Sequence, residues 1–250
     1  EPSSSVQTDP SPVRLRRFYE QPFDSNQHLL SSSMSTQVMQ RIILFILAVT
    51  MVGCAATAET TTTSNTSYEA ESFGPDELRK KGLAIMPIQS DQGVEGFRRP
   101  FGNEINKTAR STLSNAEVIT WEESQQKIND AGLVEDYREA IRSYEETSIL
   151  NQEAVQKIGG TVEKRYLLVV TLAPPQRESE YMGAGVTYEK KSVSAYGKVW
   201  DAAEGDITWE GVATTEVTTG DFLQAEGTTQ DRAQKTAEAL MRRVMGMNPL

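Results

Sequence analysis

Few side chains in this sequence could carry out chemistry. The 250 residues include one cysteine, Cys54, and one histidine, His28. A single cysteine can form neither an internal disulfide nor a cysteine-cluster metal site. If the chain is processed at Cys54, His28 is lost, and with it any histidine-based zinc site or Ser-His-Asp and Cys-His mechanism. Cys54 is therefore the residue to explain, as the candidate for a covalent modification.

Carboxylate and glycine motifs point to structure rather than to catalysis. The stretch DAAEGD (201–206) could bind calcium, but it lacks the twelve-residue ligand spacing of an EF-hand and is typical of a turn between strands. The glutamate pairs at 122–123 and 145–146 point apart on a helix, which indicates solvated faces. The stretch MGAG (182–185) lacks the lysine of a phosphate-binding loop. We predict no catalytic residue, metal ligand or cofactor, and hence no enzyme.

The composition bounds the class of protein. The net charge is −10, the apolar content is 38%, and no block of Lys and Arg exists that could bind nucleic acid. The length allows one large domain or two small ones.

An apolar segment precedes Cys54. Residues 42–53 are twelve residues without a charge, and Arg41 stands before them. As a helix they would reach only about 18 Å, against a bilayer core of ~30 Å. The length fits the apolar region of a secretory signal peptide. A buried strand with a chance cysteine is the alternative.

The residues Met51-Val52-Gly53-Cys54 resemble the bacterial lipobox. This resemblance implies that a diacylglycerol is attached to the Cys54 thiol, that the chain is cut between Gly53 and Cys54, and that the new amino group is acylated. Three acyl chains would anchor the protein stably. By the same resemblance, Ala55 implies the outer membrane, with the protein facing the periplasm.

We therefore expect four segments. Residues 1–33 are polar and Pro-rich, and we interpret them as upstream reading frame or a disordered extension, with translation starting at Met34 or Met39. Residues 34–53 are the signal peptide. Residues 54–77 are the lipidated cysteine and a flexible tether, spanning roughly 25–30 Å as a coil. Residues 78–250 form the periplasmic domain.

Hydrophobic periodicity predicts the elements of that domain. We expect a capping box of Thr120 and Glu123, a cap at Asn151, and a helix end at Gly159-Gly160. The predicted order is β-α-β-α-α-α-β-β-β-α, a single α/β domain with a mixed sheet packed by helices. The strands are expected at 83–88, 116–120, 164–175, 186–202 and 207–219. The helices are expected from near Pro100 to Asn115 and at 121–131, 133–146, 151–160 and 228–245.

Two tryptophans are candidates for a partner surface. Trp200 and Trp209 flank the turn at 201–206. They could pair across the hairpin, lie in the core, or form an exposed patch that binds a partner.

Four stretches resemble a known family. They are GLAIMPIQ, AEVITWEESQQKINDAGL, SILNQEAVQKIGGTVEKRYLLVVTL and AYGKVWDAAEGDITWEGVATTEV. Together, over about 82–245, the chain resembles the periplasmic lipoprotein domains related to CsgG, the TolB amino-terminal domain and LpoB. The loop between the strands near 173–186 is too short for the membrane hairpins of the channel-forming member. The tether is also shorter than that of the activator LpoB.

The functional expectation is a non-enzymatic, outer-membrane-anchored scaffold or an assembly or secretion accessory. Its partners would be the bilayer, through Cys54, and envelope proteins, while the oligomeric state stays open. The alternatives are a regulator or carboxylate-based enzyme of cell-wall metabolism, and a ring-forming secretion component.

Overall fold

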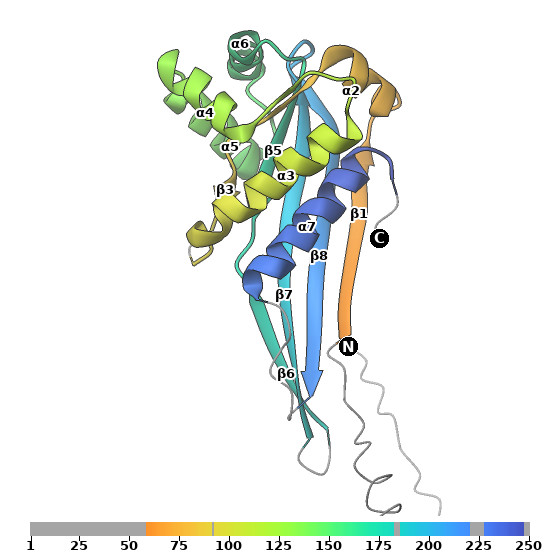
Figure 1. Cartoon of the computed structure of the whole chain (residues 1–250). Coiled ribbons are helices and arrows are strands. Elements are labelled where there is room, and N and C mark those ends of the chain that lie inside the picture. The colour runs from red at the N-terminus through yellow and green to blue at the C-terminus, as the bar shows by residue number, and fades with distance from the viewer. Residues whose placement is uncertain (1–58, 92, 183–185, 221–227, 248–250) are drawn as a thin grey trace, which may run out of the picture. The chain divides into compact units, whose positions relative to one another are not determined.

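The structure is a computed structural model that describes residues 59–91, 93–182, 186–220 and 228–247 (Figure 1). All of these residues belong to one compact unit, Ala55–Leu250. The predicted signal segment, Gly53 and Cys54 lie outside the described residues. Among the described helices, none has the length and apolar character needed to cross a membrane.

The described strands form one mixed sheet of eight strands. Its main path runs β1-β8-β7-β5-β2-β4, while β3 pairs with β5 and β6 pairs with β7. Strands β2, β4 and β5 are parallel, and the β5-β7, β7-β8 and β8-β1 pairs are antiparallel. The bounds are β1 (Glu59–Glu69), β2 (Leu83–Ile85), β3 (Gln89–Ser90), β4 (Val118–Ile119), β5 (Tyr166–Leu172), β6 (Gln176–Met182), β7 (Val186–Asp201) and β8 (Asp206–Gly220).

Helices cover both faces of this sheet. Helices α3 and α7 pack on one face, and α4, α5 and α6 on the other (Figure 1). Central strand β5 is therefore apolar on both sides, as expected for a strand buried on two faces. The bounds are α2 (Pro75–Lys81), the 3-10 helix η1 (Glu95–Phe97), α3 (Arg98–Thr112), α4 (Trp121–Asp130), α5 (Val134–Thr147), α6 (Gln152–Val162) and α7 (Thr229–Val244).

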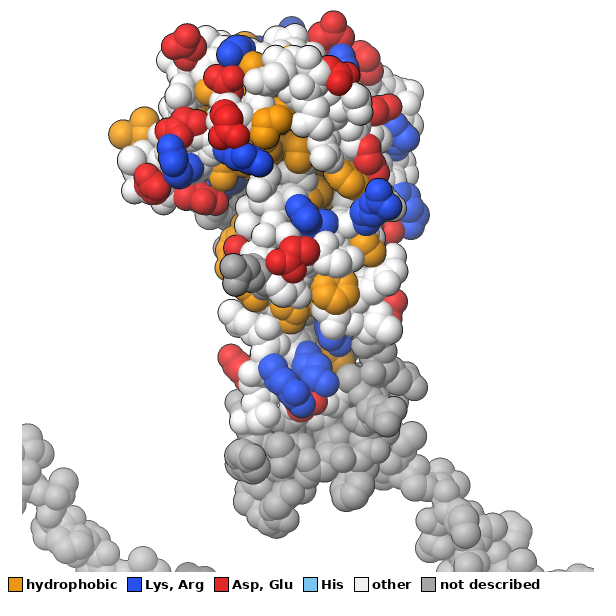
Figure 2. Space-filling model, turned by 90° about the vertical axis from the view of Figure 1, so that its left-hand side faces the viewer, with side chains coloured by type: hydrophobic (Ala, Val, Ile, Leu, Met, Phe, Trp, Pro, Cys, Tyr) orange, Lys and Arg blue, Asp and Glu red, His pale blue; other side chains and the backbone are white. Residues whose placement is uncertain are grey.

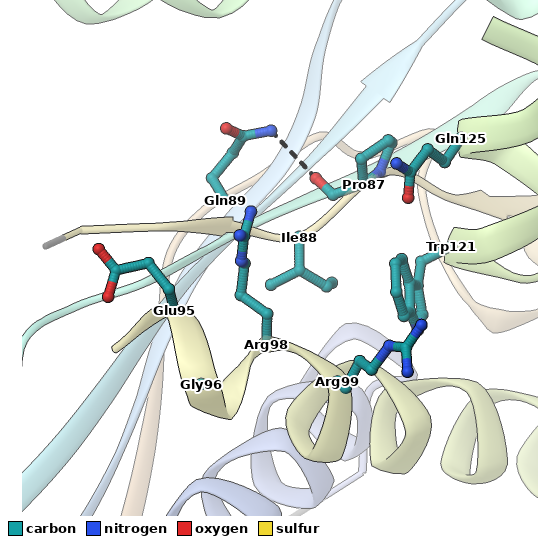
Figure 3. A pocket seen from close by; sticks show the side chains of 9 residues that line it. All are labelled: Pro87, Ile88, Gln89, Glu95, Gly96, Arg98, Arg99, Trp121 and Gln125. Atoms are coloured by element: carbon teal, nitrogen blue, oxygen red, sulfur yellow. Dashed lines mark hydrogen bonds between the residues drawn. The ribbon is translucent and has the colours of Figure 1, made fainter. Parts of the chain in front are cut away.

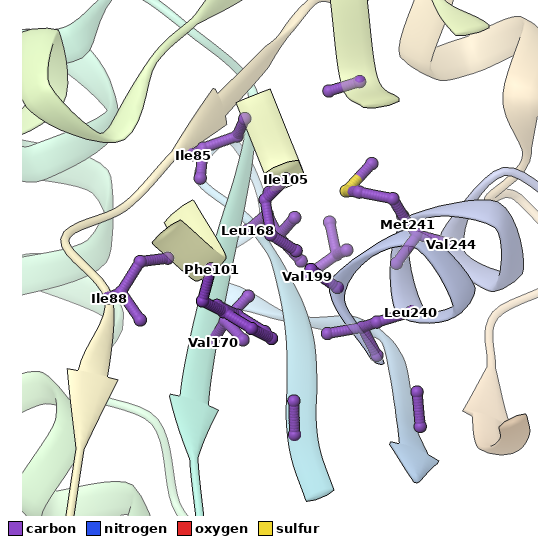
Figure 4. Packing of buried hydrophobic residues seen from close by; sticks show 14 of the residues in the cluster. Ile85, Ile88, Phe101, Ile105, Leu168, Val170, Val199, Leu240, Met241 and Val244 are labelled. Atoms are coloured by element: carbon purple, nitrogen blue, oxygen red, sulfur yellow. The ribbon is translucent and has the colours of Figure 1, made fainter. Parts of the chain in front are cut away.

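The larger core lies under α3 and α7. Phe101 and Ile105 of α3 meet Leu240 and Met241 of α7 above the inner side chains of the sheet, among them Val199 (Figure 4). These residues recur at spacings of three and four along each helix, so each helix buries one stripe. The α/β class, the mixed sheet and the order of the ten predicted elements are confirmed.

The predicted tether is wrong over most of its length. Residues Glu59–Glu69 form β1, which pairs antiparallel with β8 from Glu59 beside Thr218 to Glu69 beside Trp209. The run is rich in threonine, which favours strands, and β8 offers it an edge to pair with. Helix α2 follows at Pro75. The folded domain thus begins at least nineteen residues before the predicted boundary at 78.

Two smaller predictions are also corrected. Residues 176–182, expected within a loop, form β6 and pair with β7. The glycines at 159–160 do not end helix α6, which continues to Val162 and ends at Glu163 in the left-handed conformation. Gly159 instead lets the helix approach the β7-β8 turn, because a methyl group there would come within 2.1 Å of the Ala202 Cβ.

Candidate functional site

Trp200 and Trp209, the candidates for a partner surface, lie in the core, which was one of the alternatives left open by the sequence. The exposed fraction is 1% for Trp200 and 0% for Trp209. They also belong to opposite faces of the sheet, because Trp209 packs under α3 and α7 while Trp200 packs under α4 to α6. They neither pair with each other nor form an exposed patch, so the partner-surface interpretation is corrected. Each ring is needed to fill the space between sheet and helices.

The carboxylates of the β7-β8 turn have a structural role. The single Nε–H of Arg165 is shared between both carboxylate oxygens of Asp201, at 2.9 Å from each, and Arg165 Nη2 donates to Asp201 Oδ2 at 2.7 Å. Asp201 also accepts the backbone N–H of Ala203 at 3.0 Å. This arrangement closes the turn, as the sequence predicted. Among the described residues, no cluster of carboxylate, histidine or cysteine side chains could hold a metal ion.

The connections of the sheet create a crevice elsewhere. Strands β2 and β4 are parallel neighbours. The chain leaves β2 toward α3 on one face and leaves β4 toward α4 on the other. The crevice between the carboxyl ends of two such strands is a topological switch point, where open α/β sheets bind their ligands.

A cleft of about 510 Å³ occupies this place. Figure 3 shows the side chain of Arg98 extending toward Gln89 and that of Arg99 toward Trp121, with Ile88 between them. Gln125 lies beside Trp121, one turn further along α4. We call this the switch-point cleft, and it is lined by Pro87, Ile88, Gln89, Glu95, Gly96, Arg98, Arg99, Trp121 and Gln125.

The two arginines of the cleft are exposed and unpaired. The side chain of neither Arg98 nor Arg99 forms a hydrogen bond or ion pair with any residue that the structure describes. Both stand in the first turn of α3, which has no acidic residue. The positive end of the helix dipole disfavours cations there. The position is therefore electrostatically unfavourable in the free protein.

Trp121 is held in place by α3. A side chain at Gly102 would collide with the indole, so the glycine leaves room for the ring to lie against the helix. The Asn106 Oδ1 accepts the backbone N–H of Trp121 at 3.2 Å, and its Nδ2 donates to Glu122 at 2.9 Å. These contacts join the start of α4 to α3 across the crevice.

The predicted capping box of Thr120 and Glu123 also fixes the start of α4. Thr120 Oγ1 accepts the backbone N–H of Glu123, and the Glu123 carboxylate accepts the backbone N–H of Thr120 at 2.8 Å. The hydrogen bond from the Thr120 backbone lowers the pKa of Glu123. The prediction of this cap is confirmed, as is the cap at Asn151.

A buried tyrosine, Tyr137, fixes the wall of the cleft that Pro87 and Gln89 form. The Gln89 side chain donates to the carbonyl of Pro87 at 3.1 Å and to the hydroxyl of Tyr137 at 3.3 Å. Tyr137 donates to the same Pro87 carbonyl, and burial raises the pKa of its hydroxyl. The amide of Gln89 is thereby oriented before any ligand arrives.

A second hollow of about 460 Å³ lies by the β7-β8 turn. It contains Asp206 and Glu210, together with the exposed side chains of Tyr68 and Ile149. Tyr144 donates to Glu210 at 2.6 Å, and burial raises the pKa of this tyrosine to about 12. Burial and the neighbouring carboxylates raise the pKa of Asp206. In this hollow two carboxylates line one cavity, and one of them, Asp206, has a raised pKa.

The switch-point cleft can bind a ligand, but its lining lacks the parts of a catalytic site. It contains no serine, threonine, cysteine or lysine nucleophile and one carboxylate, Glu95, which accepts the backbone N–H of Gly93 at 3.0 Å. Acid–base catalysis needs two groups with separated pKa values. Guanidinium, indole and amide groups are instead suited to hold an anionic or planar group.

The charge of the molecule is spread over its surface. Figure 2 shows acidic and basic side chains interspersed over the helical end on the face turned to the viewer. Several opposite charges in the described chain pair one helical turn apart, such as Arg138 with Glu135 and Lys107 with Glu104. The side chains of Arg98 and Arg99 form no such pair.

This cleft is not predictable from local sequence patterns. The sequence predicts Trp121 in a helix and does not single out the arginines, because their proximity depends on the pairing of β2 with β4. One signal was available. Two arginines open a predicted helix at the end where acidic residues are favoured.

No protein-family model and no curated protein sequence matches this chain. One similar solved structure is a PelC dodecamer from Paraburkholderia phytofirmans, with TM-score 0.41 and 8% identity over 75% of this chain and 98% of that chain. A lipoprotein from Neisseria meningitidis has TM-score 0.33 and 13% identity over 66% and 97%. The LpoB C-terminal domain from Salmonella enterica has 0.31 and 12% over 58% and 86%.

All three TM-scores are below 0.5, and we take no function from them. The resemblance to the group of CsgG, TolB and LpoB stays a prediction from the sequence.

Proposed function

We propose that the chain is a lipid-anchored protein of the bacterial cell envelope that acts by binding partner proteins and has no catalytic role. The localisation rests on the lipobox-like residues 51–54 after a short apolar segment. Acylation of Cys54 would fix the protein to a membrane. Ala55 favours the outer membrane.

The binding role rests on one observation, the switch-point cleft. It lies where open α/β sheets bind ligands, and its walls are held by hydrogen bonds before a ligand arrives. Its two arginines have no partner among the described residues. Its side chains can bind but cannot supply a nucleophile with its base. A scaffold or assembly accessory needs a surface of this kind.

The anchor is tested by replacing Cys54 with serine. We expect the wild-type protein to fractionate with membranes and to carry the mass of the acyl chains, and the C54S variant to be released or to keep its signal segment. Globomycin, which blocks the signal peptidase of lipoproteins, should also preserve that segment. A C54S variant that stays with membranes, cleaved and unmodified, would refute the anchor.

The binding role is tested by crosslinking in cells. A photo-crosslinking amino acid at Gln125, inside the cleft, should give a discrete adduct with an envelope protein. The same amino acid at exposed Glu146 of α5 is the matched control. The proposal loses its support if both positions give the same adducts.

A second candidate function is a carboxylate-based enzyme of the cell wall. It is favoured by the second hollow, where Asp206, with its raised pKa, and Glu210 line one cavity. It predicts that purified protein releases soluble fragments from cell-wall material and that D206N abolishes the release. An inactive wild-type protein would remove this candidate.

A further inference from the structure

The charges of the switch-point cleft identify the chemistry of its ligand. Each guanidinium has five N–H donors in a planar fork that matches a carboxylate or phosphate group. The described chain satisfies the donors of neither Arg98 nor Arg99, although the protein has ten more acidic than basic residues. Two unpaired guanidinium groups in one cleft therefore favour an anionic ligand.

The helix that carries the arginines strengthens this argument. Helices α4, α5, α6 and α7 each have an acidic residue in the first turn, whereas α3 has none. Two cations at the positive end of α3 repel each other and oppose the helix dipole. A bound anion would relieve both effects. Local rules are broken most often where a protein has a function.

The directions of the two side chains indicate what kind of anion fits. Arg98 extends toward Gln89 and Arg99 toward Trp121, with Ile88 between them (Figure 3). Two donors that point to separate places suit two carboxylates on one extended chain better than a single phosphate. In an extended peptide, residues i and i+2 face the same side about 6.5 Å apart.

The rest of the lining suits a peptide as well. The amides of Gln89 and Gln125 can bond to a peptide backbone, and the indole of Trp121 offers an apolar wall. Glu95 lies on the far side of Arg98 (Figure 3) and repels a further negative group at that end. The cleft volume of about 510 Å³ holds a few residues rather than a single ion.

We propose that the switch-point cleft binds an acidic segment of a partner protein, with two carboxylates of that segment held by Arg98 and Arg99. This inference rests on the proposed function and names the partner chemistry of the same cleft. The side chains carry it, and the helix dipole only adds to their effect.

The test uses the full lipidated chain in nonionic detergent and a peptide probe, acetyl-Gly-Glu-Ala-Glu-Gly-amide. Binding is followed by calorimetry, and the same peptide with glutamine in place of glutamate is the control. We expect the glutamate peptide to bind at least about tenfold more tightly, since a charged hydrogen bond contributes this much or more. We expect its affinity to fall as salt is added.

Substitutions locate the binding. R98Q and R99Q should each weaken the glutamate peptide by about tenfold, as expected when a charged hydrogen bond is lost. R138Q, which removes the same charge from α5, should not. All three positions are exposed, and a matching unfolding midpoint confirms that the fold is kept.

Several outcomes would overturn the proposal. One is equal binding of the two peptides. Another is unchanged binding of the glutamate peptide by the double variant R98Q/R99Q. No binding of the glutamate peptide at millimolar concentration would also overturn it. Inorganic phosphate that competes as well as the peptide would indicate a small-anion site instead. If Gln125 still captures a partner in cells while the peptides fail, the acidic chemistry is wrong and the binding role stands.

Discussion

The indole of Trp121 lies so close to Gly102 that a methyl group there would come within 2.6 Å of the indole nitrogen. This contact joins helices that cover opposite faces of the sheet. It also sets the wall of the switch-point cleft. The position of Trp121 therefore requires a residue without a side chain at position 102 of α3.

The first prediction concerns this contact. G102A should destabilise the protein by about 1–2 kcal/mol, because overpacking costs about 1–3 kcal/mol and exceeds the gain in helix propensity. Denaturant unfolding measures it. The control is G160A in α6, where a methyl group meets nothing within 4 Å. G160A should stabilise by about 0.5–1 kcal/mol. Equal effects of the two changes would contradict the contact.

The second prediction separates stability from binding. R99E places an acidic residue in the first turn of α3 and should raise the free energy of unfolding by about 0.3–1 kcal/mol, through the helix dipole. The same change should abolish binding of an acidic ligand. A variant that is less stable and also fails to bind the acidic ligand would indicate that Arg99 has a structural partner.

The third prediction uses the three tryptophans as probes. Trp200 and Trp209 are buried, and Trp121 is partly exposed beside two arginines. Iodide should quench the fluorescence of the wild type more strongly than that of the double variant R98Q/R99Q, because the guanidinium groups raise the local concentration of anions. Caesium should show the opposite order, while neutral acrylamide should quench both proteins alike. Stronger quenching by caesium in the wild type than in the double variant would exclude a positive cleft.

The fourth prediction concerns the capping box at α4. T120A should lower stability by about 1 kcal/mol, the usual effect of losing an N-cap. Glu123 has a lowered pKa, so its contribution is present above pH 4.5 and is lost as the pH falls through the folded-state pKa. E123Q should therefore be less stable than the wild type at neutral pH and converge with it in acid, whereas the effect of T120A should persist in acid. D231N, in the capping box of α7, should behave as E123Q does, because Asp231 also has a lowered pKa.

The fifth prediction tests the first strand. Deleting residues 59–69 should lower the unfolding midpoint and promote association, because it exposes the edge of β8. Replacing residues 55–58 by glycine and serine at the same length should change neither. Light scattering and thermal unfolding measure both effects. If the deletion changed neither the unfolding midpoint nor association, residues 59–69 would act as a tether, as the sequence predicted.

The sequence contained the signals for elements with a buried face. Helix α3 shows Phe101, Ile105 and Ala109 at spacings of four, and the caps Thr120 and Asn151 are visible as residue types. These signals are local, so the order of elements could be predicted.

Strand β1 could not be predicted in this way. Its side chains are exposed or half-buried throughout, so no hydrophobic alternation marks it. Its structure comes from pairing with β8, which lies about 150 residues later in the chain. The cleft could not be predicted for the same reason, since Arg98 and Trp121 meet only because β2 and β4 are neighbours.

The early start of β1 limits the reach of the protein. With acyl chains on Cys54, as proposed, four residues remain between the lipidated residue and Glu59. At roughly 3.3–3.6 Å per residue they allow a stand-off of no more than about 18 Å from the bilayer. So short a linker raises the effective concentration of the domain near other proteins on the same membrane. A partner on the opposite side of the periplasm would have to come to it.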